Sequence, residues 1–196
     1  MKNRFIYIIF LILMSFNSSK FVLAEEFIFE VSNLEITNNG NIFKGKNRGK
    51  IISNTQLELV SDYFEYSKKK NKLEVKGNVY LVDIKNSITI KAETIFYFKN
   101  EEKISTQGKT LINISDRYRI EGYDITLLNN KMILLSDKNT IITDNDSNIY
   151  QLDSFHYLIS QEILKGKNIK VSTSKNKKIS NNNFLIKKGF FNLKEN

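Results

Sequence analysis

The side chains that could do chemistry in this 196-residue chain are few and scattered. It has no cysteine and one histidine, His156, which excludes thiolate metal sites, disulfides and a catalytic pair of histidines. Acidic pairs occur at Glu101-Glu102 and at Asp144 with Asp146, in stretches typical of turns. The run 144–148 resembles a calcium loop only faintly, because the central glycine and the terminal glutamate are missing. The sequence therefore favours a protein that is not an enzyme, and we expect no metal or cofactor.

The basic residues favour an anionic partner or surface. The formal net charge is +9, and lysines gather at Lys68-Lys69-Lys70 and again at Lys175, Lys177 and Lys178. Lipid phosphate is one candidate partner. Solvated lysines in turns are the alternative, and the abundance of lysine, asparagine and isoleucine is also typical of an AT-rich genome. Nucleic acid is not expected as a partner, because the chain begins like an exported protein.

The N-terminus has the pattern of a cleavable secretion signal. Lys2 and Arg4 precede an apolar run over 5–16, and small residues follow at Val22-Leu23-Ala24. The apolar run, at about 12 residues, is short for a membrane span. We expect 1–24 to be a signal peptide and the mature chain to lie in the periplasm, with an uncleaved anchor as the alternative.

An internal repeat of about 31 residues is the most informative feature. Each unit holds an aliphatic residue, a small residue two positions later, and an apolar residue three positions after that. The aliphatic residues are spaced by 31, 30 and 32 positions, at Leu59, Ile90, Ile120 and Leu152. The small residues are Ser61, Ala92, Gly122 and Ser154.

Apolar residues alternate on both sides of the small residue, but in opposite phase. In the first unit, Leu57 and Leu59 precede Ser61, whereas Phe64 and Tyr66 follow it. Successive residues of a strand face opposite sides of a sheet, so a change of phase would turn the core face outwards. One extra residue in a bulge or bend restores the facing. The pattern predicts a corner in every unit, where the chain bends from one sheet towards another.

The second half of each unit is a polar turn followed by another alternating run. Gly77 and Gly108 occupy equivalent places in these runs, where the third unit has Lys138, and the fourth unit is degenerate over 164–171. A half unit with a turn at 38–41 comes first. These patterns predict an all-β domain over 25–171, made of stacked bent hairpins, and a basic, partly flexible segment over 172–196.

The repeated elements resemble the OstA-like family, which includes the periplasmic bridge protein LptA and the N-terminal domain of LptD. The resemblance covers roughly residues 27–160 and depends on the elements Leu59-x-Ser61-Asp62-x-Phe64-x-Tyr66 with Gly77-Asn78-Val79, and Ile90-x-Ala92-Glu93-x-Ile95-x-Tyr97 with Gly108. Units three and four depart from it, because Tyr123 and Phe155 stand at the acidic position. The resemblance implies a twisted β-jelly roll, open at both ends.

The resemblance also implies a function. Such proteins bind the acyl chains of lipopolysaccharide in their interior and stack head to tail by pairing edge strands with other OstA-like domains. A structural assembly module and an N-terminal fragment of LptD are the alternatives within the family. A carbohydrate-active β-solenoid is a rival class, whose site would need clustered carboxylates on one face.

Two sets of residues are the candidate sites. Strand-edge contact with a partner or a second copy is expected at Phe27, Phe29 and Val31. An interior apolar face, which either binds lipid or packs only on itself, is expected at Leu57, Leu59, Phe64, Tyr66, Leu73, Val75, Val79, Ile88, Ile90, Ile95, Tyr97, Ile104, Ile112, Ile120, Ile125 and Leu127.

Overall fold

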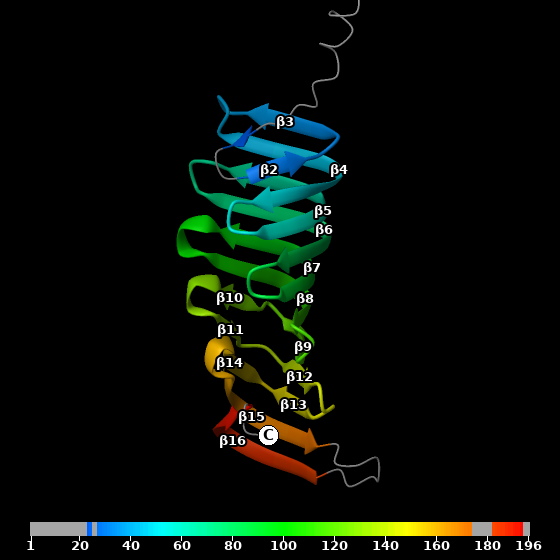
Figure 1. The fold of residues 1–196 in the computed structure, drawn as a ribbon, viewed down its shortest axis with the longest axis vertical. Coiled ribbons are helices and arrows are strands. Elements are labelled where there is room, and N and C mark those ends of the chain that lie inside the picture. Colours follow the sequence, from blue (N-terminus) through cyan, green and yellow to red (C-terminus); the bar gives the residue numbers. More distant parts are fainter. Residues whose placement is uncertain (1–22, 25–26, 174–181, 194–196) are drawn as a thin grey trace, which may run out of the picture.

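The protein is a stack of β-strands that lie across its long axis, with the N-terminal strands at one end and the C-terminal strands at the other (Figure 1). The computed structural model describes residues 23–24, 27–173 and 182–193. The strands are β1 Leu23–Ala24, β2 Phe27–Glu30, β3 Asn33–Thr37, β4 Ile42–Ser53, β5 Leu57–Ser67, β6 Lys72–Asp83, β7 Ile88–Phe98, β8 Lys103–Ile114, β9 Tyr118–Tyr123, β10 Thr126–Leu128, β11 Ile133–Ser136, β12 Thr140–Asp144, β13 Ile149–Leu152, β14 Ser154–Leu158, β15 Ile163–Thr173 and β16 Asn182–Asn192. Short 3-10 turns lie at Lys99–Glu101, Asn129–Lys131 and Ile159–Gln161.

The long strands bend at their midpoints, as the change of phase predicts. The antiparallel pairing shifts register between Val60 and Tyr63 in β5 and between Ala92 and Thr94 in β7. Between these strands, β6 bends at Gly77, whose φ of 76° lies in the left-handed region that glycine adopts without strain. A Cβ atom on Gly77 would lie 2.7 Å from a carboxylate oxygen of Asp62. Glycine is therefore required there by both conformation and space.

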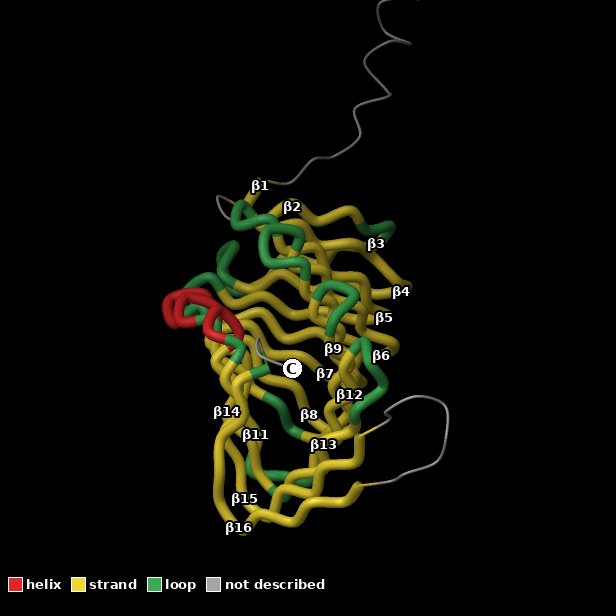
Figure 2. The backbone as a smooth tube through the Cα atoms, turned by 60° about the horizontal axis from the view of Figure 1, so that its bottom comes forward, coloured by secondary structure: helices red, strands yellow, loops and turns green. Residues whose placement is uncertain are grey.

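The bends divide the stack into two facing sheets (Figure 2). The first sheet contains β3, β10, β11, β14 and the adjoining halves of the bent strands; the second contains β2, β9, β12, β13 and the other halves. Strands β4 to β8 and β15 run through the corner into both sheets. Between β8 and β15 the chain breaks its pairing at the corner, so each sheet has short strands of its own.

Acidic side chains recur along the corner. Asp62 accepts a hydrogen bond from Asn78 Nδ2 at 2.7 Å, and Asp124 accepts one from the Gly108 amide at 2.8 Å. Asp153 accepts one from Asn168 Nδ2 at 2.5 Å. The third and fourth units thus keep an acidic corner residue, displaced in sequence from the position where Tyr123 and Phe155 stand. Units three and four therefore depart from the motif by a change in the position of the acidic residue, not by its loss.

The turns at the free ends of the strands form two rows, which we call lips. The first lip contains the turns of the first sheet, 38–41, 68–71, 99–102, 129–132 and 159–162; the second lip contains those of the second sheet, 54–56, 84–87, 115–117 and 145–148. Backbone bonds join successive turns of the first lip. They run from Lys68 N to Asn41 O (2.9 Å), Lys99 N to Asn71 O (3.0 Å), Asn129 N to Glu102 O (2.8 Å), Ile159 N to Met132 O (2.9 Å) and Leu193 N to Glu162 O (2.9 Å).

These bonds show that the repeat extends to the C-terminal strands. The acceptors recur every 30 or 31 residues, from Asn41 to Glu162, so the unit continues beyond the fourth motif. The expectation that the fourth unit is degenerate over 164–171 is wrong: β15 is a long bent strand, and Leu164, Ile169 and Val171 are buried. β16 pairs with β15 and extends the stack. The boundary expected at 171 stays a prediction, and the lysines at 175, 177 and 178 lie outside the described residues.

No helix in the described residues is long and apolar enough to cross a membrane. The predicted signal peptide lies outside the described residues, apart from Leu23 and Ala24, which form β1 and pair with β2.

Candidate functional site: the interior between the two sheets

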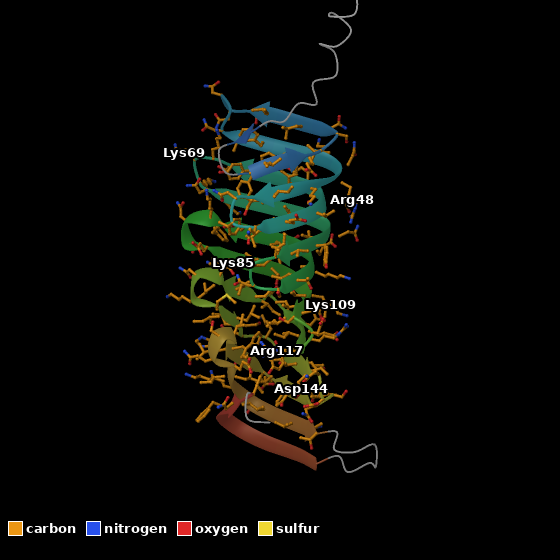
Figure 3. All side chains as sticks on the ribbon, in the orientation of Figure 1. Arg48, Lys69, Lys85, Lys109, Arg117 and Asp144 are labelled. Atoms are coloured by element: carbon orange, nitrogen blue, oxygen red, sulfur yellow. The ribbon has the colours of Figure 1, made fainter. Side chains whose placement is uncertain are left out.

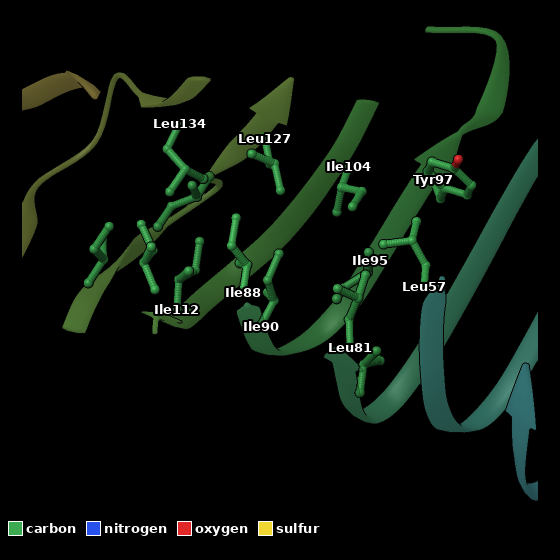
Figure 4. Close-up of a cluster of buried hydrophobic side chains, with 14 of the residues drawn as sticks. Leu57, Leu81, Ile88, Ile90, Ile95, Tyr97, Ile104, Ile112, Leu127 and Leu134 are labelled. Carbon is green, nitrogen blue, oxygen red and sulfur yellow. The ribbon is translucent and has the colours of Figure 1, made fainter. Parts of the chain in front are cut away.

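The interior is lined by two rows of apolar side chains, one on each sheet. In the second sheet, cross-strand pairing aligns Ile51, Leu59, Leu81, Ile90, Ile112, Ile120, Ile142, Tyr150 and Val171. In the first sheet it aligns Phe43, Tyr66, Leu73, Tyr97, Ile104, Leu127, Leu134, Tyr157 and Leu164. Figure 4 shows part of this cluster. The lining runs the length of the stack.

All sixteen residues predicted to face the interior are buried there, each at most 2% exposed. A side chain with no exposed surface touches no void large enough for a water molecule, and Val75, Ile88, Ile95, Ile104 and Ile112 have none. In this conformation the two sheets therefore pack directly on each other. Lipid binding by these residues remains a prediction, and it would require the sheets to move apart.

The interior has little polar surface. Thr106 and Thr110 are buried beside the corner, where Thr110 Oγ1 donates to Thr106 Oγ1 at 2.7 Å. Asp83 is fully buried at the second lip and accepts hydrogen bonds from the Asn86 amide (2.9 Å) and from Asn86 Nδ2 (2.7 Å). In the described part of the chain, every buried side-chain nitrogen or oxygen has a partner. A ligand between the sheets would thus meet a mainly apolar surface, with the Asp83 carboxylate at its margin on the second lip.

Aromatic rings fill the N-terminal end of the interior. The rings of Phe29 and Phe64 stack with centroids 4.8 Å apart, and Phe27 packs edge-on against Tyr66 at 4.8 Å. The predicted edge residues Phe27 and Phe29 lie on β2, next to the short strand β1, but their side chains point inwards. A partner at this end would therefore meet strand backbone before it met these rings.

At the N-terminal edge lies β3, which was not predicted from the sequence as a strand distinct from β2. β3 pairs with β4 and with no other described strand, whereas β1 covers β2 at Phe27 and Ile28. Ile36 of β3 is 46% exposed. Edge pairing by Phe27, Phe29 and Val31 remains a prediction, with β3 as an additional candidate.

Among the described residues, side chains of the two lips meet at Asn86–Asn129 and at Arg117–Glu162, neither of which was predicted from the sequence. Asn86 Nδ2 of the second lip donates to Asn129 Oδ1 of the first at 3.2 Å. Arg117 of the second lip forms an ion pair with Glu162 of the first. These partners are 43 and 45 residues apart in sequence. The sequence feature that could have drawn attention to Arg117 is the rarity of arginine, which occurs four times in the chain.

A pair of tyrosines lies beneath the Arg117–Glu162 ion pair. The rings of Tyr118 and Tyr157 meet edge-on from opposite sheets, 5.7 Å apart, and the Arg117 guanidinium is 5.9 Å from the Tyr118 ring. The hydrogen bond to Glu162 raises the pKa of Arg117. Burial raises the pKa of Tyr157 and, less strongly, that of Tyr118. Arg117 therefore stays charged and both tyrosines stay neutral at physiological pH.

The charged residues project from the outside of the stack (Figure 3). Some are paired across strands, as in Lys50–Glu58 at 2.8 Å and Lys44–Glu65 at 3.3 Å. Exposed pairs of this kind add little stability. Lys69 and Lys70 are exposed in the first lip, as predicted for a turn.

The other residues considered for chemistry lie apart from the interior. His156 is exposed on the outer face, paired in register with Leu135 and Lys165. Asp144 accepts hydrogen bonds from the Asn148 amide (2.8 Å) and from Asn148 Nδ2 (2.9 Å), so it closes its own turn. The described residues contain no group of three or more histidine, aspartate or glutamate side chains placed to hold a metal ion.

Comparison with known proteins bears on the fold. No protein-family model and no curated protein matches this chain. Among solved structures it is similar to LptH, described as the LptA homologous periplasmic component of the conserved lipopolysaccharide transport device from Pseudomonas aeruginosa. The TM-score is 0.53 at 11% sequence identity, and the match covers 67% of this chain and 94% of LptH. The chain thus has an LptA-like fold, which confirms the predicted twisted β-jelly roll.

Proposed function

We propose that this protein is a periplasmic lipopolysaccharide carrier, which holds acyl chains between its two sheets and passes them towards the outer membrane. The observation that supports this most is the apolar lining, which continues along the stack. On the side of the two lips, no described strand connects one sheet to the other across this lining. Burial of lipid tails there would contribute about 0.8 kcal/mol per methylene group. The fold shared with a transport component, LptH, agrees with this role.

Site-specific photo-crosslinking in cells tests the proposal. A photoreactive residue at Ile90 or Ile104, both buried in the interior, should give a lipopolysaccharide adduct. Their neighbours Lys91 and Ser105 lie on the same strands but face outwards, so they serve as matched controls. Equal labelling from inward and outward positions, or none from either, would contradict an interior lipid site.

The proposed location can be tested separately. Export through the leader predicted at 1–24 should give a periplasmic protein that lacks those residues, measured by fractionation and N-terminal sequencing. Depletion of a lipopolysaccharide carrier should make the outer membrane permeable to large antibiotics. A protein retained in the cytoplasm with its leader intact would contradict the proposed location.

A structural assembly module, or a piece of a larger LptD-like translocon, is a second candidate because β3 has an unpaired edge among the described strands. Edge pairing with another OstA-like domain or a second copy would use backbone groups of β3. Ile36 and Phe43 form a non-hydrogen-bonded pair, so the Ile36 N–H points away from β4 towards the free edge. Ile36→Pro removes this N–H and should abolish association in a pull-down or in sedimentation, whereas Ile36→Val should not. Association that persists in Ile36→Pro while lipid binding is absent would contradict both candidates.

A further inference from the structure

The two sheets can separate along one side only. At the corner they are joined by the chain itself, because β4 to β8 and β15 continue from one sheet into the other. At the lips, by contrast, side chains make the contacts, including the Asn86–Asn129 and Arg117–Glu162 pairs. Since the interior side chains are packed closely, lipid tails that enter sideways must part the lips and break these contacts.

The two contacts lie in successive turns of each lip. Arg117 follows Asn86 by 31 residues, and Glu162 follows Asn129 by 33. On the first lip the positions differ, because Asn129 begins its 3-10 turn whereas Glu162 follows the next one, at the place that Met132 holds in the unit before. We call these two pairs the seam contacts.

The seam contacts differ in chemistry. Asn86 and Asn129 are neutral, and Asn86 keeps its bonds to Asp83 when the contact breaks. Arg117 and Glu162 are charged, and they are unequally exposed. The Arg117 side chain is 50% exposed and the Glu162 side chain is 12% exposed. Glu162 is also tied to the first lip through its backbone carbonyl, which accepts from Leu193 N at 2.9 Å.

This arrangement leaves a cation at the rim when the lips part. Arg117 would lose its carboxylate partner, while Tyr118 beside it continues the apolar lining inwards. A guanidinium binds phosphate with two parallel hydrogen bonds, as it does carboxylate. A phosphate on an amphiphile whose tails lie between the sheets would reach the position that Glu162 vacates.

We infer that the seam contacts are the closed state of a lateral entry site, and that Arg117 exchanges Glu162 for the head-group phosphate of the incoming lipid. This inference depends on the proposed function, because it concerns how the same interior is loaded. It assigns Arg117 to head-group recognition and Glu162 to holding the lips closed. Asn86 and Asn129 form a second, neutral closure one unit away.

Lipid binding by purified protein tests the role of Arg117. The probes are lipid A that carries its two phosphates and the same lipid after phosphatase treatment, each in detergent micelles. Wild-type protein should prefer the phosphorylated lipid. Arg117→Gln should bind it about tenfold more weakly, the order expected for loss of one charge-assisted bidentate contact, and should bind the dephosphorylated lipid as before.

Two variants accompany this measurement. Arg119→Gln is the matched control, because Arg119 is exposed on the same strand and pairs with Glu121 at 2.9 Å on the outer face. It should keep the wild-type preference. Glu162→Gln should load both lipids faster than wild type, because the charged seam contact is gone. An unchanged phosphate preference in Arg117→Gln, or equal losses in Arg117→Gln and Arg119→Gln, would overturn the inference.

A cross-link across the lips tests entry itself. The chain has no cysteine, so Asn86→Cys with Asn129→Cys introduces the only two thiols. Joined by a disulfide or a short bismaleimide, this variant should fail to load either lipid. The unjoined variant, which keeps both thiols reduced, should load both.

Normal loading by the joined protein would overturn entry between the lips. Wild-type protein that binds neither lipid would contradict the proposed function itself, which distinguishes the two failures. Circular dichroism and thermal unfolding of every variant show whether a loss of binding comes from a loss of fold.

Discussion

At the scale of single residues, the inward-facing positions can be read from alternation alone. The sixteen predicted interior residues are all buried, because a strand places every second side chain on the same face and the bend corrects the phase. The seam contacts could not be predicted in this way. Their partners depend on how far one sheet is displaced along the other, and alternation within a strand contains no information about that displacement.

Truncation of an interior residue should be costly whether or not lipid ever binds. Ile90→Ala removes buried methyl groups from a closely packed site, so the free energy of unfolding should fall by about 2–5 kcal/mol. Lys91→Ala, one residue further and outward-facing, should change it by less than about 0.5 kcal/mol. Urea denaturation followed by circular dichroism measures both. Similar values for the two variants would show that Ile90 is not a core residue.

The tyrosine pair beneath the ion pair should make stability depend on alkaline pH. Burial raises the pKa of Tyr157 in the folded protein, whereas in the unfolded chain it ionises near its ordinary value of about 10. The folded state therefore holds its proton longer, and the associated stability is present below about pH 10 and is lost as the pH rises further. Tyr157→Phe should flatten this part of the stability curve. Curves of equal slope for variant and wild type would exclude Tyr157 as the cause.

At the scale of elements, the bent hairpins and their turns follow from local sequence, but the ends of several strands do not. Asn38 to Asn41 form the expected turn, and Gly77 and Gly108 have the positive φ values expected of a bend. The separation of β9 from β10 at Asp124 was not predicted, because pairing on both sides of the corner decides it. The same holds for β3, which follows β2 after a corner without any glycine.

The two bend glycines should respond differently to the same substitution. Both have positive φ, 76° at Gly77 and 82° at Gly108, so alanine should cost about 1–2 kcal/mol of folding free energy at each. A Cβ at Gly77 would also press on Asp62, while at Gly108 it would meet nothing within 4 Å. Gly77→Ala should therefore unfold at lower urea than Gly108→Ala. The reverse order would mean that space at the corner does not matter.

At the scale of the whole molecule, the stack is a linear array in which each unit touches its neighbours. Long-range pairing in the interior involves adjacent strands, and the turns of the first lip repeat the same backbone bond from Asn41 to Glu162. Gln56 and Ser87 hold equivalent positions in consecutive turns, with φ of 64° and 55°. One unit, 57–87, can thus be removed with both ends at the same lip.

Deletion of 57–87 should give a shorter protein that still folds. The strand content by circular dichroism should stay that of an all-β protein, and unfolding should remain cooperative, although at a lower temperature because less apolar surface is buried. Deletion of 57–71 is the control. It would connect the end of β4 at the second lip to the start of β6 at the first, so this variant should not fold. Two deletions with the same behaviour would contradict the array.

The regular spacing of the turns determines how the length of the molecule depends on the number of units. Strands in a sheet are spaced by about 4.8 Å, so a unit of two strands adds about 10 Å of height. Duplication of one unit would lengthen the molecule by that step and leave both terminal strands, with whatever they dock onto, unchanged. A gap of a given width between two membranes could then be matched by duplication of a short stretch of the gene, without any new docking surface.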